Sequence, residues 1–100
     1  MVDVFRAVAD ENRRRLIDLL RQGERPVGEL VAEVGPSYSA VSQQLKILHG
    51  AGLVQRRAEG LQRIYRLDAA PLQDVHRWAD QYRAFWTTHL ARLHRYLGDR

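Results

Sequence analysis

The sequence predicts a mainly α-helical fold with one small β-hairpin. Over most of the 100 residues, apolar side chains recur every three or four positions, which is the period of a helix. Residues 53–57 and 62–67 instead form two short predicted strands around a turn that contains a glycine, which is the pattern of a hairpin. With 45% hydrophobic residues, residues 1–100 are expected to form a single domain with a small core.

Three short helices are expected in the first third of the chain, at residues 2–9, 10–23 and 26–34. Asp10-Glu11 places negative charge where the helix dipole favours it, and Gly23 suits the C-terminal cap of the second helix. Pro26 is tolerated in the first turn of the third helix because its missing N–H would be unpaired there in any case. Arg14 points away from the buried leucines, so it either contacts a phosphate or only faces solvent.

A fourth helix follows Gly35-Pro36, with Ser37 or Ser39 as its N-terminal cap. From Val41 onward, its apolar residues form one narrow stripe that faces the core. The opposite face carries hydroxyls, an amide and one cation without any acidic residue: Tyr38, Ser39, Ser42, Gln43 and Lys46. Because such groups can pair with base edges in a major groove, we interpret this helix as a DNA recognition helix. Residues 27–51 then form a helix-turn-helix.

The hairpin at residues 53–67 is interpreted as the wing of a winged helix-turn-helix. Gly60 supplies its turn, and Tyr65 and Leu67 share the face that returns to the core. The hairpin carries four cations, Arg56, Arg57, Arg63 and Arg66. We expect them to hold the phosphate backbone or to probe a minor groove. The alternative is an arginine-rich hairpin that only faces solvent.

The net charge of +4 is concentrated in residues 37–67. This segment holds five basic residues against Glu59 alone, whereas basic and acidic residues cancel in the rest of the chain. Concentrated positive charge is typical of a nucleic-acid-binding surface. An acidic protein or a lipid is an alternative partner, but the acid-free helix beside the hairpin favours double-stranded DNA.

The last helix is predicted to run unbroken from about residue 70 to residue 97. At ~1.5 Å per residue it would be about 40 Å long, which exceeds the width of so small a domain. We therefore expect it to pair with a second copy of the chain; the alternative is a helix that packs across its own domain. The residues expected at this homodimer interface are Leu72, Val75, Trp78, Tyr82, Phe85, Trp86, Leu90 and Leu93.

The composition excludes several other classes of protein. The absence of cysteine excludes disulfides, thiolate metal sites and cysteine nucleophiles. Neither a signal peptide nor an apolar run near ~20 residues is present, so we expect a cytoplasmic protein without a membrane partner. The sequence contains no nucleophile–base pair, phosphate-cradling glycine loop or paired carboxylates at suitable spacing, so an enzyme is not expected.

Five stretches in order and spacing resemble the ArsR–SmtB family of bacterial winged-helix repressors: residues 8–20, 27–30, 40–48, 51–54 and 64–68. The resemblance implies a dimer joined through the last helix and the helix at residues 1–9, which adds Val4 and Phe5 to the interface. It also implies repression from a palindromic operator. Two departures from the family pattern are Glu11-Asn12 in place of Pro-Thr and Gln44 in place of a histidine. The second is expected to alter base preference.

The family is known for metal sensing, but its metal sites do not match these residues. Where one site has two cysteines, this chain has Pro26 and Gly28. A second site would start at Asp74-Val75-His76, but its other half falls on Thr87 and Leu90, and leucine cannot bind a metal. No metal or other cofactor is therefore expected, and His76, His89 and His94 are expected to be partly buried beside the dimer seam. Two alternatives stay open: a repressor that responds to a metal or small molecule, and a protein-interaction module without DNA binding.

Overall fold

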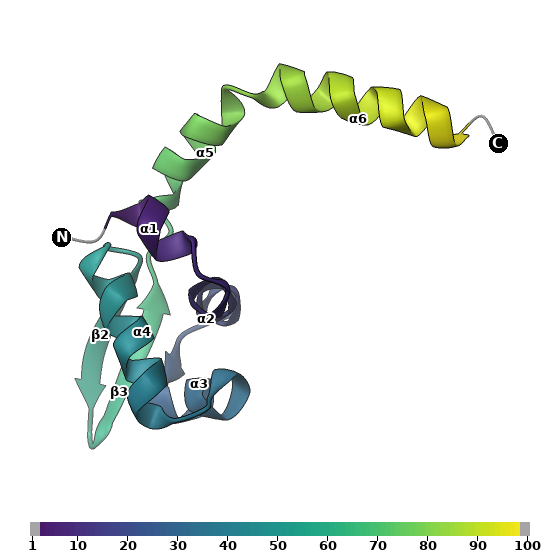
Figure 1. The fold of residues 1–100 in the computed structure, drawn as a ribbon. Coiled ribbons are helices and arrows are strands. Elements are labelled where there is room, and N and C mark those ends of the chain that lie inside the picture. Colours follow the sequence, from purple (N-terminus) through teal and green to yellow (C-terminus); the bar gives the residue numbers. More distant parts are fainter. Residues whose placement is uncertain (1–2, 99–100) are drawn as a thin grey trace.

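The computed structural model describes residues 3–98 and has the predicted winged helix-turn-helix arrangement (Figure 1). In chain order the elements are α1 (Val4–Val8), α2 (Glu11–Arg21), β1 (Arg25–Pro26), α3 (Val27–Val34), α4 (Tyr38–Gly50), β2 (Val54–Glu59), β3 (Gln62–Leu67), α5 (Leu72–Asp80) and α6 (Arg83–Gly98). Helices α3 and α4 occupy the range predicted for the helix-turn-helix, and β2 and β3 that of the wing. Residues 1 and 2 of the predicted first helix lie outside the described residues.

Side-chain caps fix where the helices begin. The Asp3 carboxylate accepts a hydrogen bond from the Arg6 backbone N–H at 2.9 Å, and Asp10 accepts one from Arg13 at 3.0 Å. Of the two serines proposed for α4, Ser37 is the cap, since its hydroxyl accepts from the Ala40 N–H at 3.1 Å. Each cap satisfies one of the donors that a helix start leaves unpaired.

The core lies between α2, α3 and α4 and one face of the β-hairpin. Its largest fully buried side chains are Leu16, Leu30, Leu45, Leu48, Leu53 and Val54. Tyr65 is buried and Leu67 packs against the same cluster, so the predicted inward face of the hairpin is confirmed. Gly60 has a φ of 61° in the hairpin turn, a conformation that favours glycine.

Strand β1 was not predicted from the sequence. It pairs antiparallel with β3, opposite Tyr65 and Ile64, and among the described residues the sheet order is β1-β3-β2. The prediction that Pro26 lies in the first turn of the third helix is wrong. Pro26 has an extended backbone (φ −70°, ψ 154°) and directly precedes α3. A two-residue strand has no periodicity of its own and exists only because β3 lies beside it.

The prediction of one unbroken final helix is also wrong, because α5 ends at Asp80 and α6 begins at Arg83. The backbone N–H groups of Gln81 and Tyr82 donate to carbonyls three residues back, at 3.3 and 3.0 Å, so the helix tightens there. Arg83 bridges the break with an ion pair to Asp80 at 2.7 Å. Neither proline nor glycine marks this position in the sequence.

Helix α6 extends away from the rest of the molecule (Figure 1). Every residue of α6 is exposed, whereas α5 packs against the core through Leu72 and Val75. The radius of gyration is 17.4 Å, against about 13 Å for a compact chain of this length. The alternative in which the end of the chain packs across its own domain therefore does not hold for α6.

Candidate DNA-binding surface

The outer face of α4 presents the polar residues expected of a recognition helix. Its inner side is locked in place by Val41, Leu45 and Leu48, which are at most 2% exposed. On the other side the predicted DNA-binding residues Tyr38, Ser39, Gln43 and Lys46 are exposed, and Ser42 is half-buried. The burial of one face leaves most of the opposite face available to a partner.

The four wing arginines divide between the two faces of the hairpin. Arg56 lies opposite buried Tyr65 in the sheet register, and residues directly opposite one another project from the same face. Arg63 precedes Tyr65 by two positions, so it shares this helix-facing side of the hairpin. Arg57 and Arg66 project from the other side. The structure therefore brings Arg56 and Arg63, rather than all four arginines, to the side of the hairpin that faces the helices.

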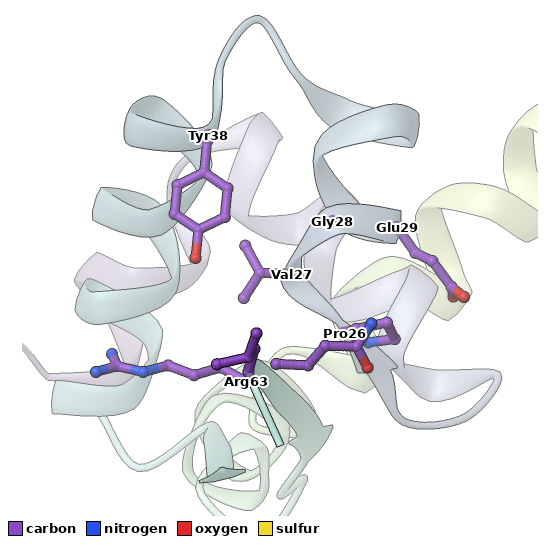
Figure 2. Close-up of a pocket in the computed structure, with 8 residues that line it drawn as sticks. Pro26, Val27, Gly28, Glu29, Tyr38 and Arg63 are labelled. Atoms are coloured by element: carbon purple, nitrogen blue, oxygen red, sulfur yellow. The ribbon is translucent and has the colours of Figure 1, made fainter. Parts of the chain in front are cut away.

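A recess of about 380 Å³ lies between the start of α4, the hairpin tip and the start of α3 (Figure 2). Tyr38 and Arg63 line it together, and in Figure 2 the Arg63 guanidinium lies on the same side as the Tyr38 ring, whereas Glu29 points away. Two predicted site residues from different elements thus meet here. Leu61 and Gln62 also line the recess but were not predicted as site residues. Gly60 could have indicated them, because the residues that follow a turn glycine lie at the tip of the hairpin.

Arg57 is held by two carboxylates. Its guanidinium donates to both Glu24 oxygens at 2.6 and 2.7 Å and to Glu59 at 2.9 Å. The hydrogen bond from Arg57 holds the pKa of Glu24 below its ordinary value, and the bond to Glu24 raises the pKa of Arg57. A phosphate contact by Arg57 stays a prediction that requires the guanidinium to leave these partners. Glu24 is distant in the sequence, so no local signal could have identified it.

Arg13 and Arg14 bind the end of α1. The Arg14 Nη1 group donates to the Val8 carbonyl at 2.8 Å, and Arg13 donates to the Ala7 carbonyl at 2.7 Å. Arg13 also donates to the Gln44 side chain at 2.9 Å. Gln44 therefore faces α2 rather than sharing the outer face of α4, which gives no support to the expectation that it alters base preference.

A second exposed surface is apolar and runs along α1, α5 and α6. The aromatic rings of Phe5, Trp78 and Tyr82 contact one another edge to face, with centroids 6.1 and 5.6 Å apart. Predicted interface residues that are about half exposed or more continue along α6, namely Phe85, Trp86, Leu90 and Leu93. Val4 differs from its prediction, since it is 7% exposed and packs in the core of its own chain. Leu72 and Val75 are likewise partly covered by that core.

The histidines form no cluster that could bind a metal. Within residues 3–98, no three His, Cys, Asp or Glu side chains are grouped as metal ligands would be. His76, His89 and His94 are exposed in the isolated chain rather than partly buried, and His89 stacks on Phe85 at 6.2 Å. Every helix in the same range is too short or too polar to span a lipid bilayer.

Comparison with known proteins gives one consistent family. A family model described as bacterial regulatory protein, arsR family, matches residues 10–56. The HTH-type transcriptional regulator Rv2034 of Mycobacterium tuberculosis is 40% identical over 83 residues, covering 83% of this chain and 75% of that protein. Transcriptional repressor SdpR of Bacillus subtilis is 32% identical over 78 residues, covering 78% of this chain and 87% of that protein.

The structural comparison agrees. The crystal structure of a possible transcriptional regulator for arsenical resistance superposes with a TM-score of 0.75 and 39% identity, covering 100% of this chain and 98% of that one. The winged helix-turn-helix fold predicted from the sequence is thereby confirmed. The chain belongs to the arsR family, and it is accordingly a transcriptional regulator rather than an enzyme.

Proposed function

We propose that this protein is a cytoplasmic, homodimeric transcriptional repressor that binds a palindromic operator without requiring a metal ion. The observation that carries the proposal is the outer face of α4, which has no acidic residue. This face lies beside Arg63 of the wing, because Tyr38 of α4 and Arg63 line the same recess. A polar helix face and a cation of this kind suit the two halves of DNA recognition, base edges and phosphates. The similar protein SdpR is named as a repressor, which supports the same role here.

In this proposal Ser39, Ser42 and Gln43 read base edges in the major groove, and Tyr38 and Lys46 flank them. An amide such as that of Gln43 can pair with an adenine edge through two hydrogen bonds. Lys46, Arg56 and Arg63 form no ion pair within the described part of the chain, so their charges are available to DNA phosphates. Arg66 and Arg57 assist from the other face of the wing.

The apolar surface of α1, α5 and α6 supports the homodimer. Five aromatic side chains on it, Phe5, Trp78, Tyr82, Phe85 and Trp86, are 43–71% exposed. A large aromatic side chain has roughly 200 Å² of surface, so about half of it from five residues amounts to roughly 500 Å² per protomer. The exposed leucines of α6 bring the total near the ~800 Å² per partner of a stable interface. Leaving this surface in water would be unusual for a monomer.

Two-fold symmetry of the dimer sets the form of the operator. Each protomer would place one α4 in a major groove, and the two half-sites would be about 10 bp apart or a multiple of it. The site is then an inverted repeat, since identical recognition helices related by a two-fold axis read identical sequences.

The metal-independent part of the proposal follows from the residues at the family's metal positions. Pro26 and Gly28 have no side-chain ligand atom, and Leu90 occupies a required ligand position in the second site. What relieves repression would then be a signal other than metal binding at those positions.

The decisive experiment is fluorescence anisotropy with DNA from upstream of the protein's own gene, followed by selection from random sequences if that fragment is not bound. Titrations are made at two salt concentrations, with zinc and with a chelator, and light scattering gives the mass of the free protein. We expect a dimer that binds an inverted repeat selectively and ignores both additions. A monomer at micromolar concentration, or binding that depends on zinc, contradicts the corresponding part of the proposal. Failure to select any sequence would favour a protein-interaction module.

A further inference from the structure

The guanidinium of Arg13 joins three helices, α1, α2 and α4. Arg13, near the start of α2, donates from Nε to the Ala7 carbonyl at 2.7 Å and from Nη2 to the Arg6 carbonyl at 3.0 Å. Its remaining terminal nitrogen, Nη1, donates to Oε1 of Gln44 on α4 at 2.9 Å. Arg13 is half-buried, as is Gln44, so the bonds to Ala7 and Gln44 are shielded in part from water, whereas the bond to Arg6 is exposed. The three acceptors are bound by three different nitrogens of the planar guanidinium, whereas a lysine presents all its donors from one nitrogen.

The two carbonyls belong to the C-terminal end of α1, and the Arg6 carbonyl also accepts a hydrogen bond from the Ala9 backbone N–H at 3.2 Å. Arg13 therefore holds α1 by charge-assisted hydrogen bonds that also suit the negative end of the helix. On its other side, α1 carries Phe5, whose ring contacts Trp78 of α5. Through α1, Arg13 is thus connected to the surface assigned to the dimer.

Gln44 connects the same guanidinium to the recognition helix. It follows Gln43, which lies on the outer face, and precedes Leu45, which is fully buried. The buried residues of α4, Val41, Leu45 and Leu48, pack through apolar contacts, which are not directional. Among residues 3–98, the bond from Arg13 to Gln44 is the hydrogen bond that joins a side chain of α4 to another helix. It therefore adds a directional restraint on the orientation of α4 to the restraint that its buried residues supply by packing.

We propose that Arg13 is a positioning residue for DNA binding: through Gln44 it fixes the orientation of the recognition helix relative to α1, and hence the separation of the two recognition helices in the dimer. The inference rests on the proposed homodimeric repressor and adds a determinant of half-site spacing to it. Its consequence is specific, because a helix fixed to the dimer tolerates one spacing, whereas a loosened helix adapts to several.

The test compares inverted repeats that differ only in the number of base pairs between the half-sites. Each added base pair moves one half-site by about 3.4 Å and rotates it by about 35° around the DNA axis. For the wild-type protein we expect the affinity to fall about tenfold or more when one base pair is added or removed. Gln44→Leu keeps the bulk of the side chain but removes the acceptor. We expect its affinity at the best spacing to be about fivefold below that of the wild-type protein, and its affinity to change by twofold or less when the spacing changes.

Two further variants separate positioning from general damage. Gln44→Glu keeps an acceptor for Arg13, so it should retain the wild-type ratio between spacings even if its added negative charge lowers affinity for all DNA. Arg13→Lys reaches fewer acceptors, so it should reduce the ratio of affinities between spacings as Gln44→Leu does. The variant that combines Arg13→Lys with Gln44→Leu should show no additional effect. Circular dichroism and light scattering check that each variant is folded and dimeric. If either Gln44→Leu or Arg13→Lys is unfolded or monomeric, the comparison with the wild-type protein is made with the other of these two variants.

The outcomes are distinguishable. Suppose that the wild-type protein binds an inverted repeat and that Gln44→Leu and Arg13→Lys keep its ratio of affinities between spacings. This result overturns the inference and leaves the proposed function intact. Equal flattening in Gln44→Glu also overturns it, since the acceptor is then irrelevant. Failure of the wild-type protein to bind any inverted repeat refutes the proposed function and this inference with it.

Discussion

Replacing Arg63 with alanine tests the wing in the most direct way. Arg63 is exposed, lines the recess beside Tyr38 and forms no ion pair within the part of the chain that the structure describes. Its side chain makes no contribution to the buried core. The substitution should therefore weaken DNA binding without changing the fold, because it removes a phosphate contact and little else.

The size of the effect follows from counterion release. Each DNA phosphate that a cation neutralises contributes about 0.9 to the slope of log affinity against log salt concentration. A dimer carries two copies of Arg63, so Arg63→Ala should reduce the slope by about 1.8. Between 50 and 200 mM salt, the ratio of the wild-type affinity to the Arg63→Ala affinity should therefore fall about twelvefold. The loss should be similar for all DNA sequences, since phosphates carry no base identity.

The assay is fluorescence anisotropy at four or more salt concentrations on one operator and one unrelated duplex. The matched control is Arg77→Ala on α5, which makes the same change in net charge at an exposed position away from α4 and the wing. We expect the control to retain the wild-type slope. If Arg63→Ala retains it as well, or if both variants lose the same amount, Arg63 does not contact phosphate and the wing assignment is refuted.

Three further predictions concern assembly, the core and pH. Leu93→Glu places a charge in the proposed α6 interface, so light scattering should report a monomer with an unchanged circular dichroism spectrum; a persistent dimer would argue against this interface. Leu45→Ala truncates a fully buried side chain of α4 and should lower the free energy of unfolding by about 2–5 kcal/mol in urea denaturation, whereas a change below 1 kcal/mol would contradict the assigned packing. Glu24→Gln should lower the melting temperature at neutral pH. Because the pKa of Glu24 is depressed by Arg57, its contribution is present above the ordinary value of 4.5 and is lost as pH falls through the folded-state pKa, so the difference from wild type should vanish in acid; an equal difference at pH 3 and pH 7 would contradict it.

Most of the recognition helix could be predicted from local sequence. Ser37 after Gly35-Pro36 starts α4, and the stripe from Val41 onward determines which face is buried. Once the buried face is known, the outer face follows from 3.6 residues per turn. The hairpin was predictable for the same kind of reason, since the turn at Gly60 and the two-residue spacing of Tyr65 and Leu67 act over a few residues. These features depend on neighbours in the chain, and the sequence lists those neighbours directly.

The candidate site was predictable only in part. The sequence places four arginines on the wing, but it does not say which of them already have partners. The ion pair of Arg57 with Glu24 and the bond from Arg13 to Gln44 join residues 33 and 31 positions apart. An arginine on a strand or helix has several carboxylates and carbonyls within its possible reach, and only the packed structure selects among them.

The sequence by itself therefore determined the order of the helix-turn-helix and the wing, the faces that α4 and the hairpin bury, and the basic surface that suits DNA. The tertiary structure decided that β1 pairs with β3, that the last helix breaks after Asp80, and that Val4 packs in its own core. It also decided that Arg57 is paired, whereas Arg56 and Arg63 form no ion pair within residues 3–98. The physical reason is one of range: helical periodicity, capping and turn conformation act between residues a few positions apart, whereas strand pairing, ion pairing and burial depend on which distant segments meet in space.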